Sequence, residues 1–136
     1  MIPTATIEYL GELRTRSTHT RSGNTIITDA PVDNHGKGEA FSPTDLTATS
    51  LVTCMISIMG IAAQKGDLDF GNVSGSVQKI MAENPRRIQE LLVEIRFQGN
   101  DLPQDKKEYL ERVALSCPVA KSLHPDIRQD VRFVYD

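Results

Sequence analysis

The sequence is poor in aromatic residues, lacks tryptophan and contains no block of like charges. Aromatic residues make up 5% of the 136 residues, and the formal net charge is -3 at pH 7. Proteins whose main partner is a nucleic acid or an anionic membrane present strongly basic, clustered surfaces. We therefore expect no nucleic acid and no membrane among the main partners of this protein.

A secretory signal and a large cysteine count are also missing. The first 16 residues, MIPTATIEYLGELRTR, show neither a basic start followed by an apolar run nor a small-residue cleavage site. We therefore expect a cytoplasmic protein. Cys54 and Cys117 are the only cysteines, and structural disulfides are rare in a reducing compartment. The two thiols are then buried and inert, a redox pair, or part of a metal site.

The remaining pattern predicts one α+β domain over residues 1–136, with the element order β-β-β-α-β-β-α-α-β and a largely antiparallel sheet. The first third has β character, with a turn at RSGN and a loop rich in Gly, Asp and Asn at residues 29–42. Two segments in which apolar and polar residues alternate lie on either side of ENPRR, and they predict a β-hairpin. In its second strand one face carries Leu91, Val93, Ile95 and Phe97. A helical pattern with Tyr109, Leu110, Val113 and Ala114 on one stripe follows, before the final strand VRFVYD.

The long apolar segment at residues 42–66 predicts a central helix of about twenty residues. Ser42 is placed as the N-cap, Pro43 opens the helix and Gly66 ends it. Ser42 and Asp45 together form a capping-box pattern. Apolar side chains cover most of the circumference, so this helix requires burial on nearly all sides. A transmembrane span is disfavoured by Asp45 and the many hydroxyl residues, and we expect a second subunit to cover the helix in an obligate homodimer.

Cys117 stands directly before Pro118, where the preceding helix ends and a short helix begins. This position makes the thiol an N-cap. Unpaired backbone N–H groups favour a thiolate there, so we expect a lowered pKa for Cys117. Cys54 lies in the middle of the long helix beside Leu51 and Ile58, where burial favours an inert thiol. A nearby cation would change this, and three arginines are candidates, although each has a solvent-facing alternative: Arg14, Arg16 and Arg21.

The sequence resembles the OsmC/Ohr family, the osmotically inducible protein C and organic hydroperoxide resistance proteins. The resemblance rests on SPTDLTATSLVTC, on SCPVAKSL with its cysteine 63 positions later, and on the element order. It implies an OsmC-like fold with a long buried central helix and an intertwined homodimer. It also implies thiol-dependent reduction of organic hydroperoxides in oxidative-stress defence. Cys54 would be the peroxidatic thiolate that becomes a sulfenic acid, and Cys117 would resolve it as a disulfide. An external dithiol such as a lipoyl group would reduce that disulfide, without a bound cofactor.

The apolar wall formed by Leu51 and Ile58 then suits an alkyl or fatty-acyl peroxide. The sequence departs from the family where the peroxidases carry a glutamate after the proline, because Thr44 occupies that position. Asp45 follows instead, and it lies about 13 Å along an ideal helix from Cys54. If Asp45 orients an arginine, it does so at the partner subunit's Cys54. Arg21 and Arg16 are the leading candidates for that arginine.

Three alternatives remain open at this point. The first is a non-catalytic member of the family that binds a small apolar ligand at the dimer interface. The second is a metal site built from both thiols and one histidine, which lacks any C-x-x-C or H-x-x-x-H spacing. The third is a cysteine-histidine hydrolase, for which no histidine stands in a recognisable relation to either thiol. We expect no metal.

Overall fold

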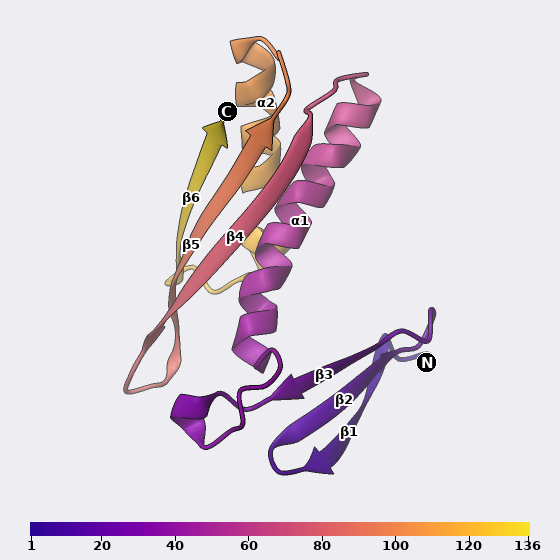
Figure 1. The fold of residues 1–136 in the computed structure, drawn as a ribbon, viewed down its shortest axis with the longest axis vertical. Helices are drawn as coiled ribbons and strands as arrows, with labels where there is room; N and C mark the ends of the chain where they lie inside the picture. Colours follow the sequence, from indigo (N-terminus) through magenta and orange to yellow (C-terminus); the bar gives the residue numbers. More distant parts are fainter. The chain divides into compact units, whose positions relative to one another are not determined.

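The element order of the structure agrees with the predicted α+β order. The computed structural model describes residues 1–136 (Figure 1). Its elements are β1 (Ala5–Gly11), β2 (Arg14–His19), β3 (Thr25–Asp29), the 3₁₀ turn η1 (Val32–Asn34), α1 (Pro43–Lys65), β4 (Asn72–Ala82), β5 (Arg87–Gln98), α2 (Gln104–Leu115), α3 (Pro118–Ser122) and β6 (Arg128–Tyr135). They form two compact units, residues 1–46 and 47–136, and each is described by itself.

The first unit is an antiparallel meander in the order β1-β2-β3. The predicted turn at RSGN joins β2 to β3, where the His19 carbonyl accepts from Gly23 N–H at 2.8 Å. Glu12 and Leu13 form the other turn with positive φ angles of 54° and 65°. Neither residue type is typical of left-handed backbone.

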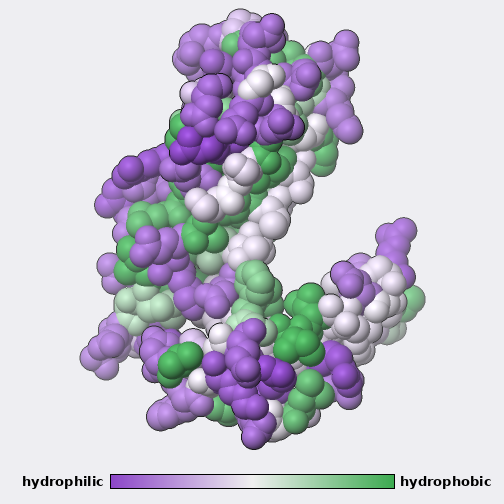
Figure 2. All heavy atoms as spheres, viewed as in Figure 1, coloured by the Kyte–Doolittle hydropathy of each residue, from purple (hydrophilic) through white to green (hydrophobic).

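One face of this sheet presents apolar side chains that the first unit does not cover. The register pairs Ile7 with Ser17 and Ser17 with Ile26, so both isoleucines point to the same side. Ile7 is 63% exposed, Tyr9 is 67% exposed and Ile26 is 46% exposed. Figure 2 shows hydrophobic residues at the surface of this part of the chain. The meander therefore has an apolar face for which its own residues provide no core.

The start of α1 follows the prediction closely. The Ser42 Oγ accepts from the Asp45 N–H at 3.1 Å, and an Asp45 carboxylate oxygen accepts from the Ser42 N–H at 2.9 Å. This reciprocal pair is a capping box. The helix runs for 23 residues, slightly longer than predicted, and ends before Gly66.

The second unit contains the sheet β4-β5-β6, with β5 in the centre. β4 and β5 form the predicted antiparallel hairpin. Three of the four strand pairings are antiparallel, as expected, and the exception is β6, which pairs parallel to β5. The reason is the connection between them, because α2 and α3 carry the chain back across the sheet before β6 begins.

The core lies between this sheet and α1. The four residues of β5 predicted on one face are at most 2% exposed. They pack with Leu51, Met55 and Met59 of α1. Gly75 allows the close approach of β4, since a Cβ there would lie 2.6 Å from a methyl carbon of Val52 and 3.1 Å from the Ile56 Cδ1. On α2, Leu110 and Ala114 are buried as predicted, whereas Tyr109 is 41% exposed.

The prediction that α1 is buried on nearly all sides is not met within one chain. Thr53, Ser57 and Ile61 lie along one helix face and are exposed, Ile61 at 50%. The helix has the length and composition of a membrane span, with a mean hydropathy of 1.8 over its most apolar 18-residue window, of which 39% is buried. Its buried side chains form the core of the second unit.

Candidate functional site

Cys117 caps the short helix α3, as the sequence predicted. Its backbone is extended, with φ -65° and ψ 152°, and Pro118 opens the helix. The Cys117 Sγ accepts a hydrogen bond from the Ala120 N–H at 3.3 Å. The side chain is completely buried. A thiol in this position is held by the local backbone as well as by the core around it.

The predicted lowering of the Cys117 pKa is wrong. Burial is the largest single influence and raises the pKa of this thiol because the charged form is desolvated, while hydrogen bonds from the N–H groups of Ala120 and Val119 act in the opposite direction. The neighbouring Cys54 raises the pKa further. Sequence reasoning identified the cap correctly and underestimated the burial. Cys117 is therefore a protonated thiol near neutral pH.

The structure brings the two predicted cysteines together within the second unit. Cys54 lies near enough to the Cys117 thiol to raise its pKa. Both thiols are free, and Cys54 is half-buried whereas Cys117 is buried. Cys54 packs against the core but keeps an accessible surface. The pair therefore consists of one thiol that solvent can reach and one that it cannot.

The two predicted substrate contacts differ in accessibility. Leu51 lies wholly within the core, at 0% exposure, whereas Ile58 is half-buried at its edge. Only Ile58 offers side-chain surface near the accessible side of α1. The hydroxyls of Ser50 and Thr53 donate to backbone carbonyls of the same helix, at 2.7 and 3.1 Å. These hydroxyls are thus engaged by the helix backbone.

The structure places the predicted arginines in different surroundings. Arg16 pairs with Glu8 at 3.2 Å in an ion pair whose side chains are 43% and 63% exposed. Arg21 is exposed in the β2–β3 turn. Neither is held in a buried position within the first unit.

Arg14 is the arginine held most firmly in this unit, and sequence reasoning gave it less weight. Its Nε and Nη2 contact the two carboxylate oxygens of Asp29 at 2.7 and 2.8 Å. Asp29 is 1% exposed and also accepts from the Glu39 N–H at 3.1 Å. The guanidinium holds the pKa of the Asp29 carboxyl below its usual value. The sequence contained a signal for this ion pair. In a hairpin, residues at equal distances from the turn lie opposite each other, and the turn at RSGN therefore pairs Arg14 with Asp29.

Asp45 acts in the capping box described above, which is the first of the two roles weighed for it. The Thr44 hydroxyl lies 3.3 Å from the Ser42 Oγ. Thr44, at the position where the family peroxidases carry a glutamate, thus places its hydroxyl beside the capping residue of α1. The second role of Asp45, orientation of an arginine, stays a prediction.

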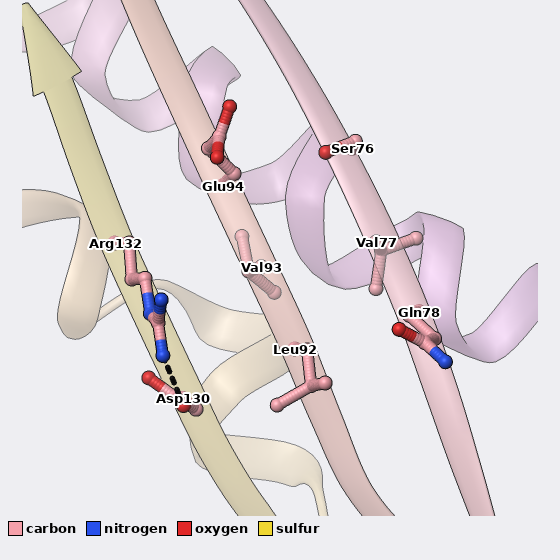
Figure 3. A pocket seen from close by; sticks show the side chains of 8 residues that line it. All are labelled: Ser76, Val77, Gln78, Leu92, Val93, Glu94, Asp130 and Arg132. Carbon is pink, nitrogen blue, oxygen red and sulfur yellow. Dashed lines mark ion pairs between the residues drawn. The ribbon is translucent and has the colours of Figure 1, made fainter.

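Two depressions in the second unit lie away from the thiols. One of 410 Å³ is on the side of the sheet away from α1, and Figure 3 shows Arg132 directed toward Asp130 there, with Nη2 and Oδ2 3.7 Å apart. The other, of 580 Å³, follows the exposed side of α1 near Ile61 and Phe70. No group of three or more His, Cys, Asp or Glu side chains is arranged to hold a metal ion. All three histidines are exposed: His19, His35 and His124.

Comparison with known proteins assigns the chain to a family. The family model described as OsmC-like protein matches residues 36–132. The chain belongs to the OsmC-like family. The match includes both cysteines and the capping box. Among curated proteins, none matches the chain.

Solved structures of OsmC-like proteins have the same fold. A protein of Psychrobacter arcticus, provisionally described as an osmotic stress induced and detoxification response protein, is 49% identical, with a TM-score of 0.92 and coverage of 98% of this chain and 96% of that chain. An organic hydroperoxide resistance protein OsmC of Legionella pneumophila is 18% identical, with a TM-score of 0.73 and coverage of 98% of both chains. The organic hydroperoxide resistance protein OhrB of Bacillus subtilis is 16% identical, with a TM-score of 0.63 and coverage of 96% and 97%. The last two show the shared fold.

Proposed function

We propose that this OsmC-like protein is a thiol-dependent peroxidase that reduces organic hydroperoxides. The observation that carries the proposal is that an accessible thiol, Cys54, lies close enough to a buried thiol, Cys117, to raise its pKa. Two neighbouring thiols can form a disulfide when their Cα atoms lie within about 7 Å. The proposal is also supported by family membership, since relatives with this fold are described as organic hydroperoxide resistance proteins.

In the first step, the Cys54 thiolate attacks the distal peroxide oxygen and the O–O bond breaks. The alkoxide leaves with a proton from solvent as an alcohol, and Cys54 becomes a sulfenic acid. In the second step, Cys117 loses its proton and its sulfur attacks the sulfur of Cys54. The S–O bond breaks, hydroxide leaves as water, and a disulfide forms. One hydroperoxide and two thiols thus yield one alcohol, one water and one disulfide.

An external dithiol, of the lipoyl type, then reduces the disulfide by exchange and leaves as the oxidised cyclic disulfide. The proposal places this cycle in the cytoplasm. The substrate class is an alkyl or fatty-acyl hydroperoxide, because the partly buried Ile58 lies one helical turn from Cys54 at the edge of the apolar core. Asp45 and an arginine of the first strands complete the site under this proposal.

The proposal includes a homodimer in which residues 1–136 act as one domain. Two uncovered surfaces support it. One is the face of α1 with Thr53, Ser57 and Ile61, and the other is the face of the meander with Ile7 and Tyr9. Soluble proteins rarely leave such surfaces unpaired. Light scattering after size exclusion is expected to give twice the chain mass at micromolar concentration, and a single chain mass would contradict the dimer.

The function is tested by intact mass and free-thiol count before and after one equivalent of cumene hydroperoxide. Wild-type protein is expected to lose both thiols and two hydrogens as an intrachain disulfide. Cys117→Ser is expected to stop at a sulfenic acid that dimedone traps at Cys54. Cys54→Ser is expected to stay reduced and serves as the matched control, since it retains the other thiol in the same fold.

Two thiols that survive excess hydroperoxide would contradict the proposed function. The non-catalytic family member that binds a small apolar ligand would then be the better account. Equal reactivity of Cys54→Ser and wild type would contradict the assignment of the nucleophile.

A further inference from the structure

Cys117 is closed off from solvent by the core and by the helix that follows it. The side chain is 0% exposed. Its Sγ accepts from the Ala120 N–H at 3.3 Å, which holds the sulfur at the start of α3. The side chain of Gln129 on β6 donates to the Ala120 carbonyl at 3.1 Å and thereby fixes α3 to the sheet. A reagent in solution can therefore reach this sulfur only when α3 and the core around it open locally.

Cys54 differs from Cys117 in this respect. It is half-buried on α1, at the edge of the apolar core. Thr53 and Ser57, which lie beside it on the same helix, are exposed. The residues one turn away carry no charge that would oppose an approaching thiolate: Ser50, Leu51, Ser57 and Ile58. Cys54 thus keeps a surface that a reagent can reach without local unfolding.

We propose that the reducing dithiol attacks Cys54 and not Cys117, so that the mixed disulfide of the cycle forms at Cys54. The inference rests on the proposed function, because it concerns reduction of the disulfide that the peroxide reaction leaves. Thiol–disulfide exchange depends on which sulfur the attacking thiolate can reach. The difference in burial between the two cysteines selects Cys54.

The bond changes of this route balance. One thiolate of the dithiol attacks the Cys54 sulfur, the bond to Cys117 breaks, and Cys117 leaves as a thiolate. The Ala120 N–H donates to this thiolate until it is protonated. The second thiolate of the dithiol then attacks the first sulfur, the bond to Cys54 breaks, and the cyclic disulfide departs. The two protons of the dithiol end on Cys117 and Cys54.

Access has to select this route, because the leaving group does not favour it. Burial raises the pKa of Cys117, and a thiol of higher pKa leaves a disulfide more slowly. Attack on Cys117 itself requires a local opening of the core, whereas attack on Cys54 requires none. The hydroperoxide and the dithiol therefore act on the same sulfur and exclude each other from it.

The test is the position of the mixed disulfide when a monothiol opens the disulfide of the protein. Diamide forms the intrachain disulfide of wild type without peroxide, 2-mercaptoethanol is added briefly, and acid stops the exchange. Peptide mass spectrometry then locates the mercaptoethanol adduct. In folded protein we expect the adduct on Cys54 to exceed that on Cys117 by about tenfold or more, since the buried sulfur reacts only after local opening. The same protein in concentrated urea is the matched control, and there we expect similar amounts on both cysteines.

An adduct mainly on Cys117, or similar amounts on both cysteines of the folded protein, would overturn the inference. Because diamide replaces peroxide, the two proposals fail separately. A diamide disulfide that opens at Cys54, in a protein whose thiols survive cumene hydroperoxide, would refute the peroxidase and retain the site of attack. A disulfide formed by cumene hydroperoxide that opens at Cys117 would do the reverse. If neither oxidant forms the intrachain disulfide, both proposals are refuted.

Discussion

Arg14 contacts the buried carboxylate of Asp29 with two nitrogens, at 2.7 and 2.8 Å. The contact lowers the pKa of Asp29, so at low pH the folded state binds fewer protons than the unfolded state. Protonation of this group therefore favours unfolding, and its contribution to stability is present above about pH 4 and lost below it. The test is thermal unfolding between pH 2.5 and 7. The stability of wild type is expected to fall more steeply in the acid range than that of Asp29→Asn, so that the two curves of stability against pH converge.

Glu8→Gln is the matched control for this experiment, because it breaks the exposed Arg16–Glu8 pair. Exposed pairs contribute at most about 1 kcal/mol. The curve of stability against pH for Glu8→Gln is expected to run parallel to that of wild type. If the curve for Asp29→Asn is also parallel to wild type, the Asp29 contact does not contribute to acid unfolding.

The capping box at the start of α1 is expected to stabilise the fold measurably. Ser42→Ala removes the oxygen that accepts from the Asp45 N–H and is expected to lower the free energy of unfolding by about 1 kcal/mol. Ser42→Thr keeps that oxygen and should retain most of the stability. Urea unfolding followed by far-UV circular dichroism measures both. Equal losses in the two variants would show that the Ser42 hydroxyl does not act as a cap.

A side chain at Gly75 is expected to destabilise the fold by a steric clash, and a second substitution is expected to relieve that clash. In Gly75→Ala the new Cβ lies 2.6 Å from a Val52 methyl, so β4 and α1 must separate, at a cost of about 1 to 3 kcal/mol. Val52→Ala creates space at that contact. The double variant is therefore expected to be more stable than the sum of the two single losses predicts, as measured by a double-mutant cycle. Strict additivity would contradict the steric account.

Tyr135 connects β6 to α2, because its hydroxyl donates to the Glu111 carboxylate at 2.7 Å. Burial, with a further contribution from Glu111, raises the Tyr135 pKa well above its usual range. The folded state therefore holds this proton more tightly than the unfolded state, so its contribution to stability is complete below about pH 10 and declines as the pH rises further. Tyr135→Phe keeps the stacking on Phe97, at 4.7 Å between ring centroids, and loses the hydrogen bond.

The variant is expected to be about 1 to 2 kcal/mol less stable near neutral pH. Stability measured between pH 8 and 11 should decline less in Tyr135→Phe than in wild type. An equal decline in both proteins would show that the raised pKa of Tyr135 does not affect unfolding.

Local patterns in the sequence were sufficient for much of this structure. The Ser42–Asp45 pair, the alternation around Val93 and Ile95, and the proline after Cys117 each specify their own backbone through neighbours within a few residues. The family resemblance brought Cys54 and Cys117 together as functional partners.

Features that depend on distant contacts were not predictable in the same way. The parallel pairing of β6 depends on how the connection through α2 and α3 crosses the sheet. The preference for Arg16 and Arg21 over Arg14 failed to anticipate a buried carboxylate partner fifteen residues away. The pKa of Cys117 was misjudged in direction, because burial depends on the assembled core and a cap depends only on the next few residues.

The order in which the thiol pair is made has a consequence for the newly synthesised chain. Cys117 follows Cys54 by 63 residues, and β6 supports α3 through the hydrogen bond from Gln129 Nε2 to the Ala120 carbonyl at 3.1 Å. At about 5 to 20 residues per second, Cys54 exists for roughly 3 to 13 seconds before its neighbour has been synthesised. Under the proposed function, Cys54 is during that interval a solitary cysteine without the thiol proposed to resolve it. If the proposed chemistry holds, a sulfenic acid formed at Cys54 in that interval has no thiol to resolve it and is open to further oxidation on the ribosome-bound chain.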